Sequence, residues 1–119
     1  MALIIDKNEK IGSFSVYLKL FKLHKSFLLM ISDQENMGIG NVTLGSPPIY
    51  EGVKSPTTSY NIFGVKSTLL STIISERASF ILKLPVLLLL FLKTKISEEE
   101  IIQPLINFIN NTLEGIIEQ

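Results

Sequence analysis

The chain has 119 residues, and this length predicts a single domain over residues 1–119 that buries a core without disulfides. Charged residues make up 18% of the sequence, against roughly 25% in a typical soluble domain, and the net charge is zero. No overall field therefore favours nucleic acid or an anionic membrane as a partner, and the lack of cysteine excludes thiolate zinc sites and disulfide frameworks.

The first half of the chain is a series of apolar runs separated by turns. Alternating patterns predict strands at 2–5, 13–24, 27–32, 39–44 and 59–63. Gly12 marks the first turn, and Lys25 with Ser26 forms a tight turn between the second and third strands. These three strands are therefore expected to form an antiparallel meander.

The strand at 13–24 has two different faces. One face is wholly apolar and consists of Phe14, Val16, Leu18 and Leu20. The other face is mixed and consists of Ser15, Tyr17, Lys19, Phe21 and Leu23. The apolar face is expected to lie on the core.

A loop over residues 45–58 interrupts the strands, because its three prolines and two glycines prevent regular structure. Loops of this length are often functional. We expect Pro48, Tyr50 and Lys54 in this loop to contact a partner protein.

The second half of the chain predicts a helix, a strand and another helix. Residues from 66 onward follow helical spacing, with a stripe made of Leu69, Leu70, Ile73, Ile74, Arg77, Ala78, Ile81 and Leu84. This helix should end before Pro85. The run at 86–92 is apolar on both faces, which predicts a strand in the middle of the sheet, covered above and below.

The last helix is predicted to begin at a capping box that runs from Ser97 to Glu100. Its apolar stripe consists of Ile101, Ile102, Leu105, Phe108, Ile109 and Leu113. Pro104 should kink the helix, and Gly115 is expected to be its C-cap.

Together these elements predict an α+β fold: one mostly antiparallel sheet of about six strands, with two helices packed on one face. No element is left to cover the other face. We therefore expect Tyr17, Phe21 and Leu23 to form a docking surface. Pairing with the same face of a second copy is the simplest closed arrangement.

Residues that carry chemistry are scarce, so we expect neither an enzyme nor a cofactor or metal. His24 is the single histidine, and no nucleophile elbow accompanies it. The segment Gly64 to Thr68 has the residues of a phosphate loop without its spacing, and anion binding by Lys66, Ser67 and Thr68 is retained as a minor alternative.

The chain resembles the small proteasome assembly chaperones of the third and fourth types in four segments. These are KSFLLMISDQENMGIGNVTLG, SPTTSYNIFG, KSTLLSTIISERASFILK with PVLLLLFLK, and EEEIIQPLINFINNTLE. The resemblance lies in hydrophobic pattern, element order and length. It implies dimerisation with itself or a paralogue, transient binding to proteasome α-type subunits during ring assembly, no enzyme activity and no cofactor.

A small dimeric scaffold of the roadblock, longin or profilin-like kind is the alternative function, since these modules also pair one sheet with a few helices. The start of the chain lacks a secretory signal, which predicts a cytoplasmic protein. The Asn-, Ile- and Lys-rich composition is compatible with an archaeal source.

Overall fold

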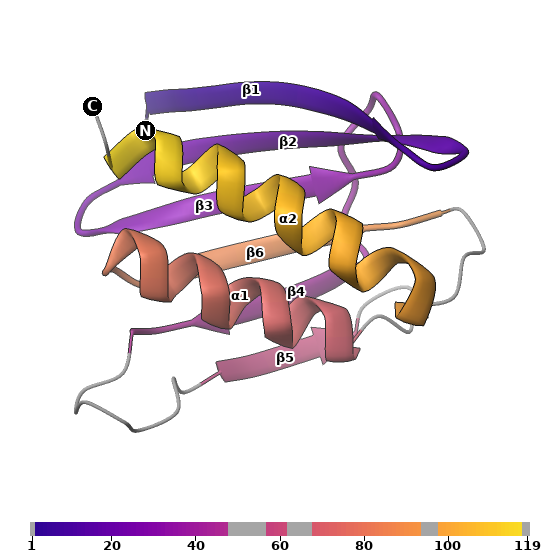
Figure 1. The fold of residues 1–119 in the computed structure, drawn as a ribbon. Coiled ribbons are helices and arrows are strands. Elements are labelled where there is room, and N and C mark those ends of the chain that lie inside the picture. The colour runs from indigo at the N-terminus through magenta and orange to yellow at the C-terminus, as the bar shows by residue number, and fades with distance from the viewer. Residues whose placement is uncertain (1, 48–56, 62–67, 94–97, 118–119) are drawn as a thin grey trace.

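The computed structural model describes residues 2–47, 57–61, 68–93 and 98–117. Within these segments, six strands and two helices follow one another along the chain (Figure 1). They are β1 (Ala2–Ile11), β2 (Phe14–Leu23), β3 (Ser26–Ser32), β4 (Asn41–Gly45), β5 (Thr57–Asn61), α1 (Thr68–Leu82), β6 (Val86–Phe91) and α2 (Glu98–Ile117).

All six strands belong to one sheet, with the order β1-β2-β3-β6-β4-β5. Neighbouring strands are antiparallel except β3 and β6, which are parallel. Both helices lie on the same side of this sheet (Figure 1). The predicted α+β fold, the meander of the first three strands and the central place of the 86–92 strand are confirmed.

Strand β1 is longer than the sequence pattern predicts, because the pattern ended at residue 5 and the strand continues to Ile11. The added residues, Asp6 to Lys10, are all exposed. Between the partly buried Ile5 and the buried Ile11, this part of the edge strand buries neither face, so hydrophobic alternation is not required there. Strand β5 begins at Thr57, two residues before its predicted start.

The core lies between the sheet and the two helices. Its fully buried large side chains are Leu18, Leu20, Leu29, Ile31, Leu70, Ile74, Leu88, Leu90, Leu105, Ile109, Leu113 and Val16. On the strands these residues alternate with half-buried ones, as expected for a sheet that is packed on one side only.

Helix α1 packs against the sheet through small residues as well as large ones. Ser71, Ser75 and Ser79 are fully buried, and they recur at intervals of four, so they lie on one face of the helix. Leu69, expected in the buried stripe, is 57% exposed, so that prediction was wrong. The serines take the place of large apolar residues because α1 lies close to the backbone of β4 at Gly45.

Helix α2 buries the predicted apolar stripe, with Ile102 partly buried at its border. Gly115 does not end the helix, which continues to Ile117, so the predicted C-cap was wrong. Gly115 does not have the positive φ that a glycine cap uses. Pro104 lies inside the helix, and its kink stays a prediction. Ser97 of the predicted capping box lies outside the described residues.

Helix α1 ends at a lysine in the left-handed conformation. Lys83 has a φ of 58°, and its N–H donates to the carbonyl oxygen of Ser79 at 2.8 Å. This conformation costs roughly 1 kcal/mol for a residue with a Cβ and little for glycine. We expect Lys83→Gly to raise the free energy of unfolding by about 0.5 kcal/mol, since the added freedom of the unfolded chain offsets part of the gain.

Urea denaturation followed by circular dichroism measures this change. Lys83→Ala removes the same charge and keeps the strained conformation, so it should give no gain. Equal effects of the two substitutions would attribute the change to the lysine side chain rather than to the backbone.

Candidate interaction surface

The face of the sheet away from the helices, called the open face below, is covered by no described helix or strand (Figure 1). It includes the half-buried residues Tyr17, Phe21 and Leu23 of β2, Leu28 and Met30 of β3, Leu87, Leu89 and Phe91 of β6, and Val42 of β4, together with the exposed Leu44. Nearly all of these side chains are apolar.

The strand register aligns these residues in rows that cross the sheet. One row is apolar from β1 to β4 and consists of Leu3, Phe21, Leu28, Leu87 and Leu44. The next row consists of Asp6, Lys19, Met30, Leu89 and Val42. The open face is therefore most apolar over β3, β6 and β4, and charged only towards β1.

The sequence predicted three residues of this face, Tyr17, Phe21 and Leu23, and all three lie on it, half-buried. The residues of β3, β4 and β6 were missed. The signal for them was present, because the run at 86–92 is apolar on both faces. It was interpreted as a strand covered on both sides, and that was wrong within the described chain: Leu87 and Leu89 face no second layer.

One end of the open face is covered by the segment that follows β3 and contains Gly38. A Cβ on Gly38 would lie 2.8 Å from ring carbons of Phe91, so the backbone at Gly38 packs directly on that ring. Asp33 fixes this segment to the end of β6, since its Oδ1 accepts a hydrogen bond from the N–H of Lys93 at 2.9 Å. The apolar rows nearer the middle of the sheet have no such cover among the described residues.

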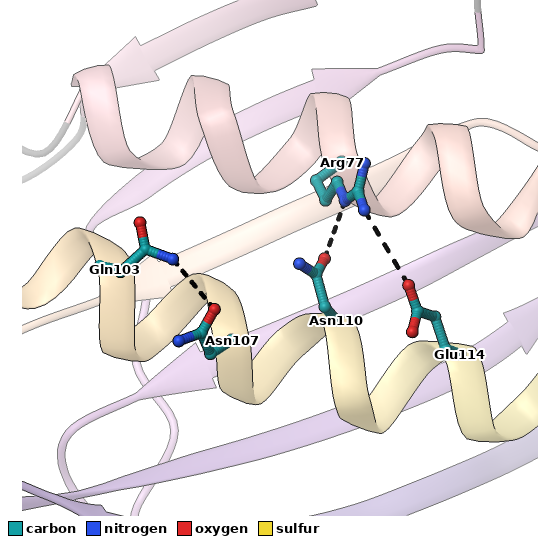
Figure 2. A network of polar contacts seen from close by, with 5 residues as sticks. All are labelled: Arg77, Gln103, Asn107, Asn110 and Glu114. Atoms are coloured by element: carbon teal, nitrogen blue, oxygen red, sulfur yellow. Dashed lines mark hydrogen bonds and ion pairs between the residues drawn. The ribbon is translucent and has the colours of Figure 1, made fainter.

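The helix side of the molecule differs from the open face, because polar contacts link the two helices on its outside (Figure 2). Arg77 of α1 donates from Nε to Oδ1 of Asn110 on α2 at 2.8 Å, and its Nη2 lies 3.9 Å from Oε1 of Glu114. The Arg77 and Glu114 side chains are about half exposed, so the ion pair contributes little to stability. The two contacts join α1 and α2 on the outer side of the helix layer.

The part of the chain that the structure describes contains no group of three His, Asp or Glu side chains able to hold a metal ion. His24 is exposed in the turn between β2 and β3. Lys66 and Ser67, proposed for anions, and Pro48, Tyr50 and Lys54, proposed for a client, lie outside the described residues.

A membrane-crossing helix is also missing from the described segments, since neither α1 nor α2 combines the required length with the required hydropathy.

Comparisons with known proteins identify the fold. No protein-family model matches the sequence, and no curated protein matches it significantly. Among solved structures, a chain from the crystal structure of a chaperone complex for yeast 20S proteasome assembly aligns with 99% of this chain and 98% of its own length. The TM-score is 0.58 and the sequence identity 6%. The chain therefore has the fold of a proteasome assembly chaperone, as the resemblance in the sequence predicted.

Proposed function

We propose that this protein is a non-catalytic assembly chaperone that pairs through its open face with a second copy or a paralogue, and that the pair binds α-type subunits while the proteasome core ring is built. The observation that carries the proposal is an apolar open face on a chain that matches a subunit of a proteasome assembly chaperone complex over nearly its whole length.

Two physical features support pairing through this face. Monomeric soluble proteins rarely leave a contiguous apolar surface uncovered, and the apolar row from Leu3 to Leu44 crosses five strands of the sheet. Burying two such faces against each other would form a sheet-on-sheet core of the kind found in sandwich proteins. In that arrangement the helices lie on the outside of both subunits.

Client binding is assigned to the surface that remains outside the pair. The loop residues Pro48, Tyr50 and Lys54 stay the candidates for contact with an α-type subunit. The wholly helical outer layer, with its polar link between Arg77 and Glu114, is the alternative contact region. Neither of these two contact regions requires a cofactor.

A single charge on the open face should weaken self-association. Leu44 is 46% exposed there, and Leu44→Glu would place a carboxylate against the partner's apolar row, with an expected loss of at least tenfold in dimer affinity because a buried unpaired charge is costly. Phe21→Glu should act in the same direction. Analytical ultracentrifugation of the purified chain measures the dimer constant.

Leu69→Glu is the matched control, because Leu69 is 57% exposed on α1, on the opposite side of the molecule. Its dimer constant should stay at the unmodified value. The same variants are then tested for recovery of proteasome α-type subunits from the native host. The proposal fails if the tagged chain recovers no second copy, no related small chain and no α-type subunit. Recovery of small GTPases or actin-like proteins instead would favour the scaffold alternative.

A further inference from the structure

Strand β1 leaves one edge of the sheet without a neighbour. It is one of the two outermost strands of the sheet, with β5 at the other end, and it pairs on its inner side only, with β2. Its register with β2 shifts between Leu3 and Ile5 and is regular from Ile5 to Ile11. This regular stretch therefore presents an unbroken row of backbone N–H and C=O groups that no described strand pairs with, which is a template for another strand.

The charges on this stretch are arranged symmetrically about Asn8. Asp6 and Lys7 precede Asn8, and Glu9 and Lys10 follow it. All four charged side chains are exposed, and none forms an ion pair within the described chain. If two copies of β1 pair antiparallel with Asn8 opposite Asn8, Lys7 faces Glu9 of the other copy and Asp6 faces Lys10. Every charge then meets its opposite.

Other registers do not have this property. In a symmetric antiparallel pair, one residue of the strand lies opposite the same residue of the other copy. Each choice of this central residue gives a different register. Centring on Lys7 sets Glu9 against Ile5, and centring on Glu9 sets Lys7 against Ile11. The register centred on Asn8 is the one that pairs all four charges and also brings Ile5 opposite Ile11.

The helix layer leaves room beside this edge. Lys7 and Glu9 point to the helix side of the sheet, because their β2 partners, Leu18 and Val16, are core residues. Both remain exposed, so α2 does not extend over this part of β1. A groove lined by Ile5, Lys7 and Ile116 among others runs between β1 and the C-terminal half of α2.

We infer that β1 is a second self-association surface: two copies of this chain join edge to edge, antiparallel about Asn8, and their sheets become one continuous sheet. This contact uses a strand edge and not the open face, so it is independent of the proposed function. Charged residues on edge strands normally prevent pairing with other chains. Here the same charges would disfavour pairing with unrelated strands and favour pairing with β1 of a second copy.

A charge swap tests the inference. The experiment uses the chain carrying Leu44→Glu, so that association through the open face is already weakened and cannot mask the result. Adding Lys7→Glu sets a carboxylate against the partner copy's Glu9 at two symmetric places and should weaken the remaining self-association by roughly tenfold or more. Glu9→Lys should do the same with the opposite charge.

The double variant Lys7→Glu with Glu9→Lys restores opposite charges in the same register and should recover the original affinity. Leu18 and Val16 opposite these positions are uncharged, so the swap breaks no pair within the chain. Sedimentation equilibrium at low salt gives the affinities, because exposed pairs are screened at high salt. Circular dichroism checks that each variant is folded.

Disulfide trapping tests the register directly, since the chain has no cysteine of its own. Asn8→Cys would bring two thiols directly opposite each other, within the separation that a disulfide spans. Lys10→Cys is equally exposed, but its two copies would lie about 13 Å apart, too far for a disulfide. Under mild oxidation, rapid covalent dimers of the first variant alone support the inference.

Two results would overturn it. One is a double charge swap that associates as weakly as the single variants. The other is equal cross-linking of Asn8→Cys and Lys10→Cys. Either outcome leaves the open-face proposal untouched, because that proposal depends on the comparison of Leu44→Glu with Leu69→Glu.

Discussion

Leu88→Ala is expected to lower the free energy of unfolding by about 3 to 4 kcal/mol, because it removes a fully buried side chain from the centre of the core. Leu88 lies in β6, the strand between β3 and β4, and its side chain faces the helix layer. Neighbouring strands and helices are held by the same core, so little collapse into the cavity is possible. The total free energy of unfolding of a domain of this size is roughly 5 to 15 kcal/mol, so the loss is a large share of it.

Leu87→Ala is the matched control, with the same chemical change one residue earlier in the same strand. Leu87 is half-buried on the open face, so its truncation should cost the monomer about 1 kcal/mol or less. Urea unfolding at low protein concentration measures both values. Equal losses for the two variants would mean that both faces of β6 are covered in the monomer, contrary to the structure.

In an assay of self-association, Leu87→Ala should have the larger direct effect and Leu88→Ala the smaller. Leu87→Ala is expected to weaken the proposed dimer, since its side chain lies in the apolar row of the open face. Leu88→Ala should affect the dimer only through the smaller fraction of folded chain.

Gly45→Ala has the second large expected effect, a loss of about 2 to 3 kcal/mol in the free energy of unfolding. A Cβ at this position would lie 2.6 Å from the carbonyl oxygen of Ser75 and 2.9 Å from its carbonyl carbon. These atoms belong to the backbone of α1, which cannot turn aside as a flexible side chain can. The helix and β4 must therefore separate, and the contact of the buried serine stripe with the sheet is lost.

Gly115→Ala provides a control of opposite sign. Nothing lies within 4 Å of a Cβ at Gly115, and the residue is inside α2. Alanine favours the helix over glycine by about 1 kcal/mol, so this variant should be slightly more stable than the unmodified chain. Thermal unfolding of the two variants side by side checks the prediction. A neutral Gly45→Ala would contradict the close approach of α1 to β4.

Much of the fold could be predicted because the elements that bury a core carry strong periodic signals. The alternation in β2 and the doubly apolar run in β6 indicated the correct strands and their correct places in the sheet. The same pattern supported the resemblance to the assembly chaperones at only 6% identity to the matched structure.

The errors have local physical reasons. Strand β1 was predicted too short because an exposed edge strand satisfies its backbone on one side and needs no apolar alternation. Leu69 was assigned to the core because large apolar residues are normally buried, whereas α1 approaches the sheet through serines. The most apolar part of the open face, which includes β6, was missed. A strand that is apolar on both faces has the same sequence pattern whether its second face is covered by its own chain or by another chain.

The place of β6 in the sheet has a consequence for the order in which the protein is made. Strands β1 to β3 leave the ribosome first and can form their meander at once, but the neighbour of β3 is residues 86–91, which are synthesised much later. Until then β3 has a bare edge and two largely apolar faces, which are the features that lead nascent chains to aggregate. The pairing of β3 with β6 therefore leaves a period in synthesis during which β3 is open to wrong contacts.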